Sequence, residues 1–312
     1  MTNQYFVAVI GAGPAGLFGA RELANKGARV ALFNRDIKPG GLAEYGIYPN
    51  KYTMKSGLRK QFRQVIDLPN LDYYGNITVG STGDLTLDDL RALGVQAILV
   101  TVGAQGTKWL GLPGEELEGV YHAKDVVYYY NHLPPFSQKS FYFGKRCAVI
   151  GAGNVMLDIT HYLAREKKVE EVIAVVRRGP AEIKFEKKEM EYVIDNLDVA
   201  ALDAEIKRVA PIMQAVHQDP DAARATILAA LPKALPKVSD TRFRFEFLAS
   251  PVQMLGDENG KLKQVEIEDN ILVEANGDTK AKGTGHKRCL DVETVIFAIG
   301  DKVDDSFGLP VE

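Results

Sequence analysis

The chain has 312 residues, of which 46% are hydrophobic and 25% charged, and its formal net charge is -3. This length exceeds the usual size of a single hydrophobic core, so two domains are expected, and the charge balance gives no support for a nucleic-acid partner. The N-terminus does not have the pattern of a signal peptide, and no apolar run has the length of a membrane span. We therefore expect a cytoplasmic protein.

The first predicted elements are a strand, a glycine turn, a helix and a second strand, together spanning residues 6–36. In this pattern Gly11 allows a tight turn, Gly13 lets a pyrophosphate approach the backbone, and Gly16 lets the helix pack closely on the sheet. The phosphates would bind unpaired N–H groups at the start of the helix. We therefore favour dinucleotide binding over a merely structural glycine turn.

Residues 40–49 are too rich in glycine and aromatic residues for a regular element. Glycines beside flat apolar groups let the backbone lie close to an extended planar ligand, although a long surface loop is the alternative. A helix over 55–66 and a strand over 73–79 are predicted next. Thr86, with Asp89 three residues later, is typical of a helix start.

Two apolar runs end in glycine in the same way, at 95–102 and at 292–300. Such continuous runs are typical of parallel strands. Their similarity predicts that the chain leaves a first domain after one run and returns to it at the other. The expected first domain is 1–104 with 291–312, and the expected second domain is the intervening segment 105–290.

The second domain repeats the N-terminal pattern. Residues 146–158 form an apolar strand that ends in a glycine turn at Gly151, and a helix over 157–165 and a strand over 172–176 follow. Two such motifs, each bounded by strand and helix, indicate two dinucleotide-binding units.

The strand over 172–176 ends in Arg177 and Arg178. An acidic residue at this place would bind a ribose 2′-hydroxyl, whereas a guanidinium pair suits a 2′-phosphate. We therefore expect this unit to prefer NADP(H) to NAD(H), the alternative being an exposed basic turn. The matching place in the first unit holds Asn34 and Arg35, and Asn34 can still bond hydroxyls without a charge.

The remainder of the second domain predicts a charged helix over 184–196, a helix over 220–231, and strands over 241–247 and 263–268 in a small antiparallel sheet. The two cysteines, Cys147 and Cys289, form no CxxC pair, which disfavours a dithiol–disulfide reductase, and an iron–sulfur centre is excluded because there is no cysteine cluster. The five histidines show no ligand spacing, so no metal site is expected.

Several longer motifs occur together: GAGPAG at 11–16, GGLAEYGIYP at 40–49, VGAQGTKWLGLPGEELEGV at 102–120, GAGNVMLD at 151–158, RRGPAEIKFEKKE at 177–189, FLASPVQMLG at 247–256 and AIG at 298–300. With them the sequence resembles the adrenodoxin-reductase-like flavoproteins, which are ferredoxin-NADP reductases related to the small subunit of glutamate synthase. The resemblance covers nearly the whole chain. It implies an α/β fold with two Rossmann-like, three-layer dinucleotide-binding domains, the second inserted into the first, and a small antiparallel sheet.

The resemblance also implies the cofactors and their sites. FAD would bind the first domain, at Ala15, Asn34, Leu42 and Val79. NADP would bind the second, at Ala152, Gly153, Asn154, Val155, Arg177, Arg178 and Glu189. With the glycine-rich segments and their neighbours, the candidate FAD-binding residues also include Gly11, Gly13, Pro14, Gly16, Arg35, Gly41, Gly46 and Gly103.

The reaction implied by the resemblance is hydride transfer from NADPH to the flavin, followed by release of single electrons to a ferredoxin-like protein. The cofactors carry this chemistry, so positioning residues are expected in place of a catalytic triad. One branch of the family pairs a histidine with an aspartate near the nicotinamide, and here those places hold Lys51 and Asp158. A Lys51–Asp158 contact is therefore a candidate, the alternative being that Asp158 bonds local backbone.

Three departures from the family pattern stand out. Met156 replaces a small residue of the second glycine motif, so the helix must sit farther from the strand or the side chain must turn aside. Asn34 replaces a glutamate. Relatives continue past the segment 308–310 with a strand and a helix, so we expect the C-terminal part of the FAD-binding domain to be missing from this chain.

Two other functions remain open. One is an electron-input subunit of a complex like glutamate synthase, which the missing N-terminal cysteine cluster argues against. The other is a shortened dinucleotide-binding module without turnover. Basic residues at 184, 187, 188, 242 and 244 could dock an acidic ferredoxin, but a solvated charged face explains them equally well. No membrane partner is expected, and the oligomeric state is not readable from the sequence.

Overall fold

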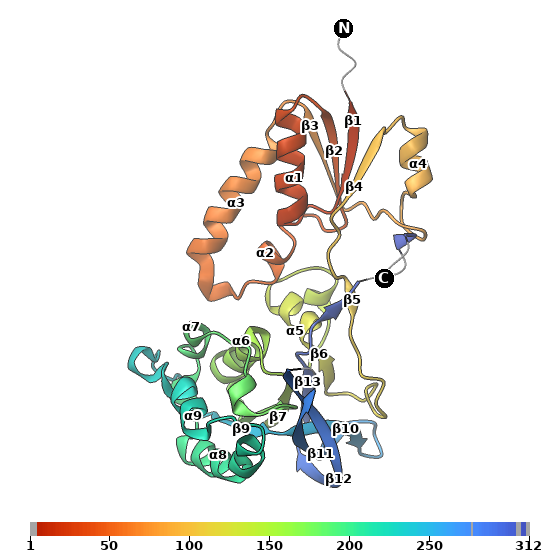
Figure 1. Cartoon of the computed structure of the whole chain (residues 1–312). Coiled ribbons are helices and arrows are strands. Elements are labelled where there is room, and N and C mark those ends of the chain that lie inside the picture. The colour runs from red at the N-terminus through yellow and green to blue at the C-terminus, as the bar shows by residue number, and fades with distance from the viewer. Residues whose placement is uncertain (1–4, 276, 304–306, 310–312) are drawn as a thin grey trace. The chain divides into compact units, whose positions relative to one another are not determined.

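The computed structural model describes residues 5–275, 277–303 and 307–309, and Figure 1 traces the chain. The chain divides into two compact units. Unit 1 comprises Met1–Lys108, Val127–Lys139 and Gly300–Glu312, and unit 2 comprises Trp109–Val126 and Ser140–Ile299. The described part of the chain contains no helix with the length and apolar character needed to cross a membrane.

Unit 1 is built on a parallel sheet with the strand order β3-β2-β1-β4. Its strands are β1 (Phe6–Ile10), β2 (Arg29–Asn34), β3 (Leu71–Gly75) and β4 (Ala97–Val100). The helices α1 (Pro14–Asn25) and α3 (Tyr52–Ile66) contribute Leu17, Phe62 and Val65 to a core on one face, and α4 (Leu87–Ala92) contributes Leu90 to a core on the other. The expected helix start at Thr86 is confirmed, because Thr86 and Asp89 form a reciprocal capping box.

Shorter elements complete unit 1. They are α2 (Leu42–Tyr45), the 3₁₀ turns Pro49–Lys51 and Phe136–Gln138, and the antiparallel pair β5 (Gly106–Thr107) and β14 (Asp301–Lys302). The boundary between the two units passes through α5 (Ala123–Tyr130).

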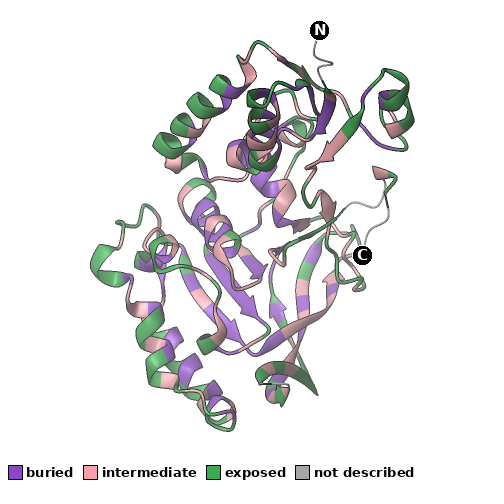
Figure 2. Ribbon diagram, turned by 45° about the horizontal axis from the view of Figure 1, so that its top comes forward, coloured by how far each residue is buried: buried purple, intermediate pink, exposed green. Residues whose placement is uncertain are grey.

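Unit 2 has a five-stranded parallel sheet in the order β6-β13-β7-β8-β9. The strands are β6 (Val120–His122), β7 (Arg146–Ile150), β8 (Glu171–Val176), β9 (Arg242–Phe247) and β13 (Thr294–Phe297). One face packs against an antiparallel sheet of β10 (Ala249–Gly256), β11 (Leu262–Ala275) and β12 (Asp278–Asp291), so that Ile173 and Val175 share a core with Val265 and Ile267. Figure 2 shows the parallel strands as the most continuously buried part of the unit.

The helices of unit 2 are α6 (Asn154–Tyr162), which continues as a π-helical turn over Leu163–Lys167, α7 (Lys187–Met190), α8 (Val199–Gln214) and α9 (Pro220–Leu228). Short 3₁₀ turns lie at Pro180–Glu182, Ile194–Asn196 and Leu231–Lys233. The second glycine motif is therefore placed as expected, between a strand and a helix. Two Rossmann-like units and a small antiparallel sheet are confirmed.

Three structural predictions were wrong. The run over 292–300 does not return to the first sheet, because β13 pairs with β7 and β6 in unit 2. The strand β9 is parallel to β8 and does not join the antiparallel sheet. The segment 184–196 is not one helix, since Glu186 is extended and its N–H donates to Asn154 Oδ1 at 2.8 Å. A buried apolar strand suits either sheet, and such long-range bonds override local propensity.

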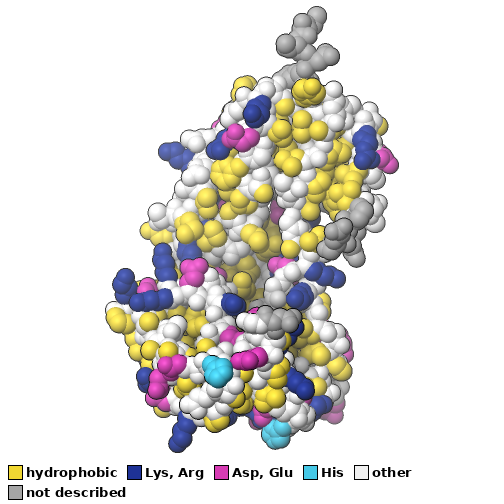
Figure 3. All heavy atoms as spheres, in the orientation of Figure 1, with side chains coloured by type: hydrophobic (Ala, Val, Ile, Leu, Met, Phe, Trp, Pro, Cys, Tyr) yellow, Lys and Arg dark blue, Asp and Glu magenta, His cyan; other side chains and the backbone are white. Residues whose placement is uncertain are grey.

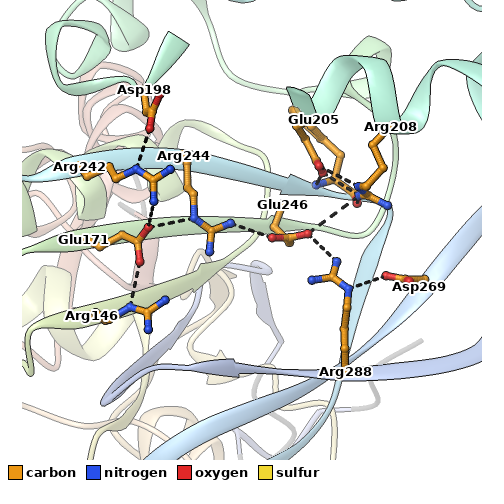
Figure 4. Close-up of polar contacts among 11 residues, drawn as sticks. Arg146, Glu171, Asp198, Glu205, Arg208, Arg242, Arg244, Glu246, Asp269 and Arg288 are labelled. Carbon is orange, nitrogen blue, oxygen red and sulfur yellow. Dashed lines mark hydrogen bonds and ion pairs between the residues drawn. The ribbon is translucent and has the colours of Figure 1, made fainter. Parts of the chain in front are cut away.

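A charged network lies on the face of the unit 2 sheet that meets the antiparallel sheet (Figure 4). Along β9, Phe243, Phe245 and Phe247 are buried and alternate with Arg242, Arg244 and Glu246. Glu171 of β8 accepts hydrogen bonds from Arg146, Arg242 and Arg244 at 2.8–2.9 Å. Burial would raise the pKa of Glu171, but its hydrogen bonds and charge interactions with Arg244 and Arg146 outweigh burial and hold the pKa below its ordinary value.

Candidate functional site

Unit 1 contains a cavity of about 320 Å³ at the carboxyl ends of its strands. The paired strands bring these ends together, since Ile10 of β1 lies opposite Phe33 of β2 and Val100 of β4. Ligands of open parallel sheets bind at this edge. The lining includes most of the residues predicted to bind FAD: Gly11, Gly13, Pro14, Ala15, Asn34, Arg35, Gly41, Leu42, Val79 and Gly103.

The three glycines of the first turn have different surroundings. Gly11 has a φ of +99°, and a Cβ placed there would lie 2.6 Å from the carbonyl oxygen of Thr101. A Cβ on Gly16 would lie 1.8 Å from the carbonyl oxygen of Gly11, so α1 packs closely only because this residue is glycine. A Cβ on Gly13 would meet nothing within 4 Å. Gly13 therefore faces open space at the start of α1, as a phosphate site requires.

The glycine-rich segment 40–46 lies against this turn. The N–H of Gly40 donates to the carbonyl oxygen of Ala12 at 2.7 Å, and a Cβ on Gly41 would come within 3.0 Å of Gly13 Cα. Leu42, at the start of α2, lines the cavity and is 56% exposed. Gly46 follows α2 and, like Gly16, does not line the cavity. Both glycines shape the backbone behind the cavity.

Asn34 is buried and bonded inside the protein. Its Oδ1 accepts from the N–H of Ala12 at 3.0 Å, and its Nδ2 donates to the carbonyl oxygens of Asp36 at 2.8 Å and Lys38 at 3.2 Å. The side chain thus holds the glycine turn to the end of β2. Its predicted contact with ribose hydroxyls stays a prediction. Arg35 reaches across the rim, with Nη2 donating to Gln105 Oε1 at 3.0 Å.

Sequence reasoning missed part of the lining. Thr101 Oγ1 lies 2.9 Å from the carbonyl oxygens of both Ile10 and Gly11, and so ties the end of β4 to the glycine turn. The segment after β3 adds Ile77, Thr78 and Gly80. These residues directly follow the carboxyl ends of neighbouring parallel strands, and that rule of topology could have identified them.

The second glycine turn lies in unit 2, between β7 and α6. Gly151 has a φ of +147°, and a Cβ there would lie 2.4 Å from the carbonyl oxygen of Ala298. Gly153 precedes α6, and a Cβ on it would meet nothing within 4 Å. Met156 occupies the place of Gly16 and is fully buried, with its Sδ 3.7 Å from Thr160 Oγ1. Unlike α1, α6 therefore leaves room beside its strand for a long side chain.

The other predicted NADP-binding residues lie on the segments that follow β7 and β8. The N–H of Lys184 donates to the carbonyl oxygen of Ala152 at 2.8 Å, and Asn154 Oδ1 accepts from Glu186, so the segment 184–186 lies along the turn. Val155 is 45% exposed on α6, and Glu189 belongs to α7, directly after that segment. The pair Arg177–Arg178 follows β8, with Arg177 exposed and Arg178 partly buried.

Lys51 and Asp158 belong to different units. Lys51 ends the 3₁₀ turn Pro49–Lys51 in unit 1, and Asp158 lies in α6 of unit 2. Their contact near the nicotinamide stays a prediction.

The pyridine nucleotide-disulphide oxidoreductase family model matches residues 5–311. The NADPH-ferredoxin reductase FprA of Mycobacterium leprae is 30% identical over an aligned length of 338 residues. The alignment covers 99% of this chain and 73% of that protein. The mitochondrial NADPH:adrenodoxin oxidoreductase of Arabidopsis thaliana is 30% identical, with coverages of 100% and 72%. The solved structure of Mycobacterium tuberculosis FprA in complex with NADPH matches with a TM-score of 0.83 at 28% identity, covering 99% of this chain and 74% of that one. The chain therefore belongs to the pyridine nucleotide-disulphide oxidoreductase family, among the adrenodoxin-reductase-like ferredoxin-NADP reductases.

Proposed function

We propose that this chain is an FAD-dependent oxidoreductase that takes hydride from NADPH and delivers single electrons to a ferredoxin-like protein. The observation that carries the proposal is the pair of glycine turns at Gly11 and Gly151, each between a parallel strand and a helix. Only in the second unit does an arginine pair follow the next strand. The names of the relatives, NADPH-ferredoxin reductase and NADPH:adrenodoxin oxidoreductase, agree with it.

The cavity of unit 1 fits FAD. Open space at Gly13 and the N-terminus of α1 suit a pyrophosphate, and the apolar side chains of Leu42, Ile77 and Val79 suit a flat ring. FAD, when bound, supplies the exchange between two-electron hydride chemistry and one-electron transfer. The residues of the chain bind this group and orient it.

The turn at Gly151 fits the pyrophosphate of NADP(H) for the same reason, since Gly153 faces open space at the start of α6. Arg177 and Arg178 supply guanidinium groups where the adenosine ribose of such a ligand lies. Charge-assisted bonds to a 2′-phosphate would give NADPH its advantage over NADH. Lys51 and Asp158 remain our candidates for residues beside the nicotinamide.

A ferredoxin-like acceptor carries acidic groups, so the exposed basic residues bear on docking. Lys184, Lys187 and Lys188 are exposed in unit 2. The side chain of Arg244 is only 16% exposed and is bonded to Glu171 and Glu246, which makes it unsuitable for docking. Lys and Arg side chains lie on both units, with acidic side chains interspersed (Figure 3).

We also propose a cytoplasmic location. The thiol chemistry of the chain supports this proposal, because Cys147 and Cys289 are both free. The same two thiols provide no dithiol for disulfide reduction. Fractionation of cells with an antibody to the chain tests the location.

The central experiment is anaerobic stopped-flow reduction of the FAD-loaded protein with NADPH and with NADH. We expect NADPH to bleach the flavin faster. Arg178→Ala should lower the apparent affinity for NADPH about 10- to 100-fold, the loss expected for one or two charge-assisted hydrogen bonds, and leave NADH unchanged. Arg91→Ala, an exposed arginine of unit 1, is the matched control. Equal rates with both nucleotides would contradict the assignment of the arginine pair.

Two measurements separate the other candidate functions. A protein that binds NADP(H) but takes up no flavin when FAD is added is the binding module without turnover. A protein whose flavin is reduced by NADPH, yet which reduces ferredoxin only when it is assembled with a larger subunit, is the electron-input subunit.

Asp158→Asn tests the candidate pair, because an unchanged rate of flavin reduction would exclude a role for Asp158 beside the nicotinamide.

A further inference from the structure

Unit 2 has a cavity of about 590 Å³ beside Arg178, in addition to the cavity of unit 1. The segment after β8 forms one wall, and residues 274, 275 and 277–279 at the facing ends of β11 and β12 form another. Two cations, Arg178 and Lys184, face three carboxylates, Glu182, Glu274 and Asp278. A phosphate dianion entering this cavity would therefore meet a surplus of negative charge.

The two acidic partners of Arg178 are held differently. Glu182 has a side chain only 9% exposed, accepts from the N–H of Gly179 at 3.1 Å, and lies 3.3 Å from Arg178 Nη1. The hydroxyl of Thr279 also donates to it. Asp278 lies 3.7 Å from the same Nη1 with its side chain 71% exposed. Glu182 is thus a buried partner, whereas the carboxylate of Asp278 is exposed to water and accepts from the N–H of Thr279 at 2.8 Å.

The β11–β12 hairpin is anchored so that Asp278 is held beside the arginine pair. Asn270 of β11 is 3% exposed, and its Nδ2 donates to the carbonyl oxygen of Arg177 at 3.0 Å. On β12, Arg288 bonds Asp269 at 3.0 Å and reaches Glu246 on β9, as Figure 4 shows. With Thr279 bonded to Glu182, β12 is held both at this network and by the segment that follows β8.

We propose that Asp278 is a specificity-determining residue that competes with the 2′-phosphate of NADP(H) for the guanidinium of Arg178. This inference rests on the proposed binding of the 2′-phosphate by the arginine pair. Without nucleotide, the carboxylate of Asp278 partly neutralises the positive charge of Arg178 with which the phosphate would interact. Binding of a 2′-phosphate must displace it, whereas a nucleotide with a free 2′-hydroxyl need not. Asp278 therefore lowers the discrimination between NADP(H) and NAD(H).

The test is calorimetric titration of the full chain with adenosine 2′,5′-bisphosphate and with 5′-AMP. Asp278→Asn should tighten binding of the bisphosphate about two- to fivefold, the range expected for an exposed ion pair, and leave 5′-AMP unchanged. Glu274→Gln is the matched control, since it removes one charge from the same cavity at a residue for which the described structure shows no ion pair with Arg178. Circular dichroism verifies that each variant is folded.

The outcomes distinguish failure of the proposed competition from failure of the proposed 2′-phosphate site. If the unmodified chain binds the bisphosphate more tightly than 5′-AMP, loses that preference in Arg178→Ala, and shows no change in Asp278→Asn, only the competition is overturned. An equal gain in Asp278→Asn and Glu274→Gln also overturns it, because the effect is then one of general charge. If the unmodified chain shows no preference for the bisphosphate, the proposed 2′-phosphate site fails, and the competition with it.

Discussion

Lys55, buried in α3, donates a hydrogen bond of 2.7 Å from its Nζ to Oδ1 of Asn131, a residue 76 positions further along the chain. Asn131 in turn donates from Nδ2 to the carbonyl oxygen of Tyr45 at 2.9 Å. Burial lowers the pKa of Lys55, despite the opposing charge of Glu44. The pair thus fastens the segment 127–139 to the glycine-rich loop of the candidate FAD site.

Asn131→Ala should therefore destabilise unit 1 more than Lys55→Met does. The alanine leaves a buried ammonium group without its nearest partner, at a cost of about 2 kcal/mol. The methionine removes the charge and keeps most of the volume, which costs less. Urea unfolding measures both, with Lys60→Met, an exposed lysine of the same helix, as the control. A larger loss in Lys55→Met would show that the charge itself holds the loop.

Substitutions of Gly13 and Gly16, at the start of α1, should have different effects. Gly16→Ala places a Cβ against backbone and should lower the free energy of unfolding by about 3 kcal/mol. Gly13→Ala meets open space, so the protein should fold normally and bind FAD about tenfold or more weakly, as expected when one charge-assisted hydrogen bond is lost.

Thermal unfolding without FAD, and titration of the apoprotein with FAD, separate these two effects. Gly57→Ala is the control, because a Cβ there also meets nothing within 4 Å and lies in the interior of α3. It should leave FAD binding unchanged and raise stability slightly. Normal FAD binding in Gly13→Ala would place the pyrophosphate elsewhere.

The sequence predicted those parts of the sites whose causes are local. Gly11 and Gly151 adopt positive φ values beside strand backbone, and only glycine suits that geometry, so the motif alone located both turns. The partners of Asn34 could not be predicted, because Asp36, Lys38 and the glycine turn come together only in the folded unit. The same holds for β13, whose apolar sequence suits either sheet and whose neighbours are decided by packing.

The two thiols should react at very different rates. Cys147 is fully buried in β7, and burial raises its pKa to about 12, whereas Cys289 is exposed on β12. Since the thiolate is the reacting form, one thiol per chain should react with Ellman's reagent in the folded protein and two in urea. In Cys289→Ala the folded protein should show none. Rapid reaction of both thiols in the native protein would mean that β7 opens readily.

Glu171 should make stability depend on pH in the acid range. It is the common acceptor for Arg146, Arg242 and Arg244, so Glu171→Gln removes the carboxylate that three guanidinium groups share. Arg242 keeps its ion pair with Asp198, and Arg244 keeps its ion pair with Glu246. We expect a loss of about 2 kcal/mol at neutral pH, below the value for a fully buried pair because Arg146 and Arg242 are partly exposed. Glu170→Gln, next to it and exposed, should cost little.

The sign of the pH effect follows from the lowered pKa of Glu171. Its contribution is fully present above the unfolded-state pKa of a glutamate, about 4.3, and is lost as the pH falls through the lower pKa of the folded state. Unfolding free energies of the unmodified chain and of Glu171→Gln should therefore differ by a constant amount from pH 6 to 8, on the order of the loss given above, and converge as the pH falls below about 4. A difference that persists undiminished into strong acid would mean that the glutamine amide destabilises the fold because it packs or bonds poorly. The charge of the Glu171 carboxylate would then not be what stabilises the three arginines.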